Sequence, residues 1–135
     1  MSLNLTLAAA DLEKTAIFYR KILLLSPEQV PNSRTENNSL VLFFGEMRVV
    51  FQNLQVMEGR HPALLQNLTR SPLGVGMQLE LSYNSLDDVD RMIKYYHWPI
   101  VYELDDQEHR RRELWLHDPD GYLLVLNEEK ITPGQ

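Results

Sequence analysis

The first third of the chain combines a strand-like pattern of side chains with a helical one. Residues 3–7 alternate apolar and polar side chains, as a half-buried strand does. Between residues 11 and about 24, apolar side chains recur every three or four positions, at Leu12, Ala16, Tyr19 and Leu23. This spacing predicts an amphipathic helix. Asp11 can cap its N-terminus, and Ser26-Pro27 ends it.

Short apolar segments then predict three further strands. They cover residues 28–30, 40–44 and 48–53, and the last two form a hairpin about Gly45 and Glu46. The order in this part of the chain is therefore strand, helix and three strands.

The second half repeats this order without repeating the sequence. A strand is predicted at residues 76–82, and a helix follows that begins at Ser85 in a pattern typical of a capping box, with Asp88 as its acidic member. Trp98-Pro99 ends this helix. Three strands follow at residues 100–104, 112–116 and 122–127.

These elements predict a single domain over residues 1–135, made of two βαβββ modules. Module one covers about residues 1–57 and module two about residues 74–130. A polar connector at about 58–73 carries a short helix near residues 62–68. The apolar helix faces favour helices packed on one side of each sheet, which is an α+β architecture.

Composition narrows the classes of protein. The chain has 135 residues, is 44% hydrophobic and 24% charged, and carries a net charge of −6, so we expect no nucleic-acid partner. No apolar run has the length of a membrane span and no signal peptide is visible, which favours a cytoplasmic protein. Cysteine is absent, which excludes disulfides and thiolate chemistry. The chain has neither a phosphate-binding loop nor a nucleophile elbow.

Two motifs point to a known superfamily. Asp11-Leu12-Glu13-Lys14-Thr15-Ala16-Ile17-Phe18-Tyr19 lies near the N-terminus, and His117-Asp118-Pro119-Asp120-Gly121-Tyr122 forms a predicted turn before the last strand. Together they resemble the vicinal oxygen chelate superfamily, which includes glyoxalase I, bleomycin-resistance proteins and extradiol dioxygenases. The resemblance covers nearly the whole chain. It implies paired curved mixed sheets around a cleft, with the helices outside, and a homodimer.

The resemblance also implies four positions for ligands of a divalent metal. Counted from the motifs, they are Asn4, Gln52 or its neighbour Phe51, Gly76 or its neighbour Met77, and Val125. None is His, Asp or Glu, and catalytic metal sites usually use about three such ligands. We therefore expect no metal cofactor, with a divalent metal as the alternative. The histidines lack metal-site spacing, and His61 is expected to be exposed in the connector.

Strand alternation predicts which side chains line the cleft. The predicted lining is apolar and aromatic with a few polar groups: Asn4, Thr6, Gln52, Gly76, Gln78, Glu80, Tyr102, Trp115, Val125 and Asn127. Such a lining suits a small organic molecule. Glu80 and Glu113 are the candidates for a catalytic base.

Three functions remain open on the sequence. The first is a metal-free protein that binds a small organic ligand, similar to the bleomycin-resistance branch. The second is a lyase, isomerase or dioxygenase of the glyoxalase type, and the third is a non-catalytic regulatory or assembly module. The sequence identifies neither the ligand nor the surface that pairs two copies.

Overall fold

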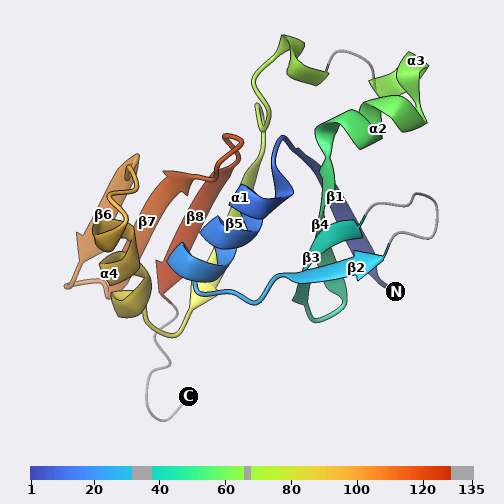
Figure 1. The fold of residues 1–135 in the computed structure, drawn as a ribbon. Coiled ribbons are helices and arrows are strands. Elements are labelled where there is room, and N and C mark those ends of the chain that lie inside the picture. The colour runs from blue at the N-terminus through green and yellow to red at the C-terminus, as the bar shows by residue number, and fades with distance from the viewer. Residues whose placement is uncertain (32–37, 66–67, 129–135) are drawn as a thin grey trace. The chain divides into compact units, whose positions relative to one another are not determined.

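The computed structural model describes residues 1–31, 38–65 and 68–128. The chain separates into two compact units, Met1–Leu73 and Gly74–Gln135, which we call the first and second unit and describe separately. Each contains one four-stranded mixed sheet with a helix on one side, so the predicted α+β class and the two βαβββ modules are confirmed (Figure 1). No helix within the described residues has the length and hydrophobicity needed to cross a lipid bilayer.

The first unit carries its sheet in the order β1-β4-β3-β2, with β1 and β4 parallel and the other pairs antiparallel. Its strands are β1 (Leu3–Ala9), β2 (Glu28–Pro31), β3 (Asn38–Phe44) and β4 (Met47–Asn53). Its helices are α1 (Leu12–Ile17), the π-helical turn η1 (Phe18–Ile22), α2 (Leu54–Arg60), α3 (Pro62–Leu65) and the 3-10 turn η2 (Leu68–Arg70).

The first predicted helix is confirmed in place but differs in form. Asp11 caps it as expected, because its carboxylate accepts hydrogen bonds from the backbone N–H groups of Glu13 and Lys14 at 3.0 and 3.2 Å. From Phe18 the backbone widens into a π-helical turn that ends at Ile22, rather than continuing as an α-helix to residue 24. The apolar spacing does not distinguish these forms over a single turn.

The predicted connector contains more helix than expected. Asn53 ends β4 and also caps α2, since its side-chain oxygen accepts from the backbone N–H groups of Gln55 and Val56. We predicted one short helix over residues 62–68. The structure instead has α2, which we did not predict, then α3 and η2; residues 66–67 lie outside the described residues.

The second unit carries its sheet in the corresponding order, β5-β8-β7-β6, with β5 and β8 parallel. Its strands are β5 (Gln78–Tyr83), β6 (Tyr102–Asp106), β7 (Arg111–His117) and β8 (Leu123–Glu128), and its helix is α4 (Asp87–Tyr95). The capping box is only half formed. Ser85 Oγ accepts from the Asp87 N–H at 3.2 Å, whereas the Asp88 carboxylate pairs with Arg91 instead of returning to Ser85.

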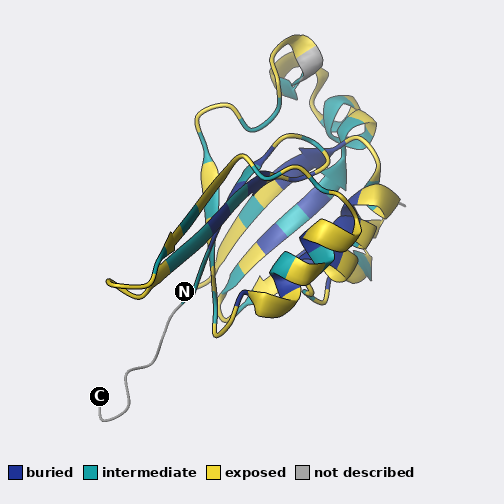
Figure 2. Cartoon of the chain, turned by 90° about the vertical axis from the view of Figure 1, so that its left-hand side faces the viewer, coloured by how far each residue is buried: buried dark blue, intermediate teal, exposed yellow. Residues whose placement is uncertain are grey.

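The core of each unit lies between its helix and its sheet (Figure 2). In the first unit the ring of Tyr19 contacts that of Phe51 at a centroid distance of 5.0 Å. In the second unit Leu114, Leu124 and Leu126 are fully buried on the corresponding side. The hydrophobic effect therefore fixes which face of each sheet is covered and leaves the other face with more polar side chains.

Candidate functional site

Predicted site residues of the first unit lie on the sheet face opposite α1. Asn4 and Thr6 pair in register with Arg48 and Val50, and successive side chains of a strand point to opposite faces. Gln52 therefore shares a face with Asn4 and Thr6. Phe51 points to the other face, where it is 0% exposed. Of the two residues considered for the second ligand position, Gln52 is thus the one that shares a sheet face with Asn4.

A hollow of about 390 Å³ lies over these three side chains. Helices α2 and α3 supply its remaining wall. Its lining residues are Asn4, Thr6, Gln52, Met57, Arg60, His61 and Leu65. Within the described part of the chain, the side chains of Asn4, Thr6, Gln52 and Arg60 have no hydrogen-bond or ion-pair partner. The hollow thus offers several hydrogen-bond donors that no described residue uses.

Arg60 and His61 were not predicted as site residues. The sequence places them in the connector, and His61 is exposed there as expected. Its backbone carbonyl accepts hydrogen bonds from the N–H groups of Leu64 and Leu65 at 3.0 and 2.7 Å, which fixes the corner between α2 and α3. A sequence signal that could have predicted α2 is Asn53, a good N-cap residue, followed by apolar side chains at Leu54, Val56 and Met57.

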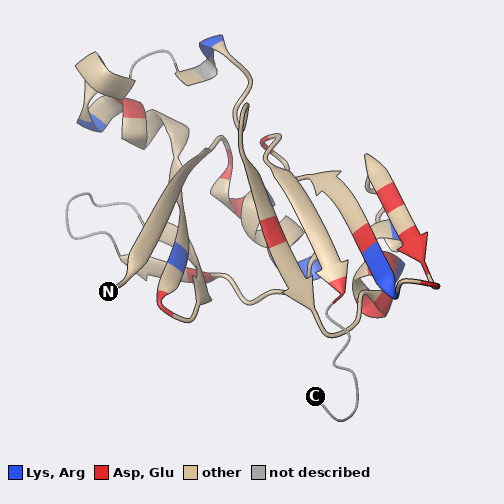
Figure 3. Cartoon of the chain, turned by 180° about the vertical axis from the view of Figure 1, so that it is seen from behind, with Lys and Arg blue, Asp and Glu red and all other residues tan. Residues whose placement is uncertain are grey.

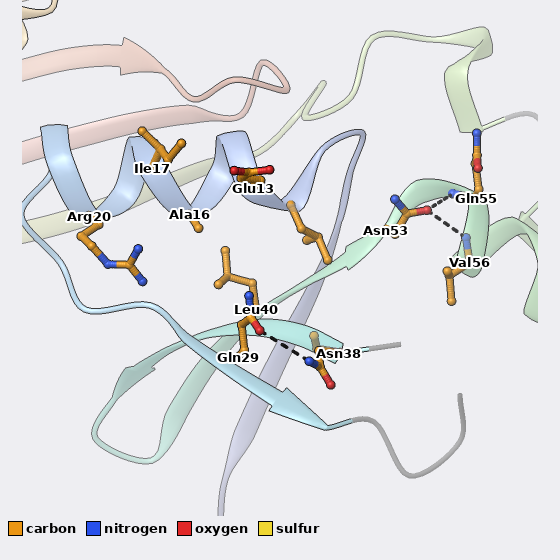
Figure 4. A pocket seen from close by; sticks show the side chains of 12 residues that line it. Glu13, Ala16, Ile17, Arg20, Gln29, Asn38, Leu40, Asn53, Gln55 and Val56 are labelled. Carbon is orange, nitrogen blue, oxygen red and sulfur yellow. Dashed lines mark hydrogen bonds between the residues drawn. The ribbon is translucent and has the colours of Figure 1, made fainter. Parts of the chain in front are cut away.

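A larger hollow of about 840 Å³ lies on the other side of the same unit, between α1, β2, β3 and the start of α2 (Figure 4). It contains none of the predicted site residues. Several of its polar groups already serve the protein: Asn38 donates to Gln29, Arg20 donates to the Pro27 carbonyl, and Asn53 caps α2. We therefore favour the smaller hollow as the candidate site of this unit.

The second unit also has a sheet face opposite its helix. Register places Glu80 and Trp115 on either side of Val125, and Tyr102 beside Trp115. The predicted alternation, in which Trp115 and Val125 point the same way while Leu114 and Leu116 point to the helix, agrees with this register. Gln78 and Asn127 lie on the same face.

Two aromatic rings lie on this face at the edge formed by β6. Tyr102 and Trp115 meet edge to face, with ring centroids 5.4 Å apart and planes inclined by 72°. The indole nitrogen Nε1 of Trp115 is buried and has no acceptor among the described residues. Buried donors are nearly always paired in folded proteins, so this N–H is a group that a bound molecule could satisfy.

The two carboxylates considered as bases also lie here. Asn127 donates to Glu80 through its side-chain amide at 2.5 Å, and in register it lies beside Glu113 on the neighbouring strand. The Glu113 side chain is 19% exposed, and its carboxylate lies 3.8 Å from a guanidinium nitrogen of Arg111. Glu80 therefore accepts a hydrogen bond from Asn127, while the contact found for the Glu113 carboxylate among the described residues is the 3.8 Å ion pair with Arg111.

Gly76 does not occupy the predicted position. We expected it within a strand over residues 76–82, but β5 begins at Gln78. Gly76 has a backbone φ of +81°, a left-handed conformation that an extended strand excludes. Asn4 lies seven residues before Asp11, whose carboxylate caps α1. The same offset from Ser85, whose Oγ accepts from the Asp87 N–H just before α4, selects Gln78.

These residues do not fit a divalent metal. Asn4, Gln52 and Gln78 offer neutral amides, Val125 offers no donor atom, and Gly76 lies outside the strand. Divalent metals in catalytic sites are held mainly by imidazole and carboxylate groups. In the part of the chain that the structure describes, no three His, Asp or Glu side chains are grouped as metal ligands. The chemistry of this site is therefore argued from its amide, indole and carboxylate groups and not from a metal.

A separate ionic cluster ties α4 to its sheet. Arg112 on β7 pairs with Asp87 at 2.6 Å and with Asp90 at 3.2 Å, and its guanidinium lies 3.8 Å from Glu128. Figure 3 shows acidic and basic residues on both α4 and β7. The hydrogen bond from Arg112 lowers the pKa of the Asp87 carboxyl. Arg112 lies three positions before Trp115 on β7, so their side chains point to opposite faces of the sheet. The cluster therefore lies on the helix side of the sheet and is not part of the candidate site.

Comparison with solved structures shows the fold of the chain. A hypothetical protein, SA1046 from S. aureus, matches with a TM-score of 0.66 and 19% identity over 96% of this chain and 92% of that chain. A glyoxalase/bleomycin resistance protein from Streptomyces sp. CB03234 matches with a TM-score of 0.64 and 15% identity, over 95% and 100% of the two chains. A lactoylglutathione lyase from Agrobacterium tumefaciens matches at 0.59 and 16%, over 95% and 92%.

The chain therefore has the vicinal oxygen chelate fold of the glyoxalase/bleomycin resistance/dioxygenase superfamily, as its motifs predicted. No protein-family model matches the sequence, and no curated protein matches it. At these identities the likeness establishes the fold, and the fold hosts many chemistries. Function must be argued from the side chains of this chain.

Proposed function

We propose that this protein binds a small organic molecule and does so without the divalent metal that its resemblance to the superfamily implies. The positions that would ligate a metal carry amides and a valine, which suit hydrogen bonding and packing rather than coordination. The sheet faces opposite α1 and α4 also carry polar groups and, in the second unit, an aromatic pair. This combination is typical of ligand sites, which are largely apolar with a few placed polar groups.

The indole N–H of Trp115 carries the proposal. It is buried beside Tyr102 and lacks an acceptor among the described residues. An acceptor oxygen or nitrogen on a flat organic molecule would complete this bond while the molecule packs against the two rings. Trp98 behaves differently, because its indole N–H donates to the His117 carbonyl at 2.8 Å.

This difference provides a test in which the protein carries its own reference. Protein labelled with ¹⁵N at tryptophan gives two indole N–H signals, and the variant Trp115→Phe assigns them by removing one. Titration with a library of small aromatic amides, acids and amines should shift the Trp115 signal saturably and leave the Trp98 signal in place.

The proposal fails if no compound shifts the Trp115 signal saturably, or if every compound shifts both signals alike. Each titration is repeated with a chelator in the buffer. A ligand that binds equally well there supports metal-independent binding, whereas binding that is lost with the chelator contradicts it.

We also propose that the protein is a homodimer, as the resemblance to the superfamily implies. Light scattering after gel filtration measures the mass directly. A mass near twice 15.8 kDa is expected, and a mass near 15.8 kDa contradicts the proposal.

A further inference from the structure

We infer that the hollow over Asn4, Thr6 and Gln52 binds an oxyanion, a carboxylate or phosphate carried by the ligand, with Arg60 as its main contact. The inference rests on the proposed ligand-binding function and adds the chemical class of the ligand. It comes from the charge, the free donors and the size of the hollow in the first unit.

The charge of the hollow is opposite to that of the chain. Although the net charge is −6, the only ionisable side chains among the seven lining residues are Arg60 and His61. None of the seven is Asp or Glu. A cation in a recess without carboxylates attracts an anion more strongly than an exposed cation does, because solvent screens it less.

Arg60 differs from the other described cations because it combines partial burial with the lack of a carboxylate partner in the described part of the chain. Arg112, the other described cation that is partly buried, pairs with Asp87 and Asp90. Arg60 is half-buried and has no such partner within the described residues.

The acid closest to Arg60 in sequence is already engaged. The Glu58 carboxylate accepts a hydrogen bond from the backbone N–H of Leu68 at 3.2 Å. A half-buried guanidinium has lost part of its hydration, so an external oxyanion is the natural group to compensate it.

The neighbouring side chains suit the same ligand. The amides of Asn4 and Gln52 and the hydroxyl of Thr6 can all donate hydrogen bonds, and none is used within the described residues. A guanidinium presents a planar pair of donors that matches two oxygens of a carboxylate or phosphate. A volume of about 390 Å³ is enough for a small organic anion.

The test uses the intact ¹⁵N-labelled chain and two probes, methyl phosphate and acetate, in buffer with low chloride. Saturable shifts are expected at the backbone amides of Asn4, Thr6, Gln52, Arg60 and His61. The preferred probe tells whether the site favours phosphate or carboxylate. Arg60→Gln should weaken binding about tenfold or more, which is the usual effect of losing a hydrogen bond to a charged group.

Arg48→Gln is the matched control. Arg48 lies on the same sheet face next to Asn4 but does not line the hollow, and its guanidinium lies over the Phe43 ring at 5.4 Å. The substitution Arg48→Gln removes the same charge as Arg60→Gln. If Arg60 acts through direct contact, Arg48→Gln should therefore leave the affinity for the anion within about twofold. Equal weakening by both substitutions, or no saturable shift with either probe, overturns the inference.

The outcome is separable from that of the proposed function. The Trp115 indole signal reports binding in the second unit whatever happens at Arg60. A neutral compound that shifts Trp115 while both anions fail at Arg60 contradicts only the oxyanion site. Anion binding at Arg60 without any ligand at Trp115 supports the oxyanion site and contradicts the Trp115 contact.

Discussion

Replacing Asp118 tests the turn that joins β7 to β8. Asp118 is 3% exposed, and its Oδ1 accepts hydrogen bonds from the N–H groups of Asp120 at 2.9 Å and Tyr122 at 3.0 Å. Asp118→Ala leaves both donors without this acceptor. An unsatisfied donor costs about 1–3 kcal/mol, and only the Tyr122 bond is fully buried. We therefore expect a loss of about 3 kcal/mol in the free energy of unfolding.

Two further variants make this prediction specific. Asp118→Asn keeps an acceptor oxygen and should cost only about 1 kcal/mol. Asp11→Ala also removes two bonds from backbone N–H groups to a carboxylate, at 3.0 and 3.2 Å, but these lie at an exposed helix cap. This substitution should cost about 1 kcal/mol. Urea denaturation followed by circular dichroism gives each value. If Asp118→Ala costs no more than Asp11→Ala, burial of the turn is not what stabilises it.

Three other substitutions have outcomes that the structure decides. Gly74→Ala should destabilise by about 2–3 kcal/mol, because its φ is +83° and a Cβ would lie 2.8 Å from the Tyr122 ring. Gly76→Ala has nearly the same φ but open space around it, so thermal denaturation should show a loss nearer 1 kcal/mol; equal losses would contradict the steric argument. Arg112→Gln should raise the pKa of Asp87 toward its ordinary 3.8, because the bond that lowers it is removed. The lowered pKa of Asp87 stabilises the folded protein at pH values above 3.8. This stabilisation is lost as the pH falls through the pKa that Asp87 has in the folded state. NMR titration of the carboxyl carbon measures the shift, and an unchanged pKa would contradict the role of Arg112.

Elements with a local signal could be predicted from the sequence. Asp11 followed by a regular apolar spacing identified the first helix, and strand alternation placed Trp115 and Val125 on one face. In both cases the physical cause lies within a few neighbouring residues: a capping side chain, or the period of two along a strand.

The remaining features depend on contacts or backbone angles that the sequence does not display. Asn53 serves as both the last residue of β4 and the cap of α2, so a strand assignment hid the helix behind it. The left-handed backbone of Gly76 delays β5 and moves the candidate position to Gln78. Arg60 reaches the hollow only because α2 places it there, which no motif indicates.

Elemental analysis measures most directly whether the protein holds a divalent metal, which the proposed function excludes. The protein is expressed in medium supplemented with zinc, nickel, manganese and iron, and it is analysed before any chelator is used. We expect metal well below one equivalent per chain, and a melting temperature that a chelator leaves unchanged. A stoichiometric metal that disappears on substitution of Asn4 or Gln52 would contradict the proposed function.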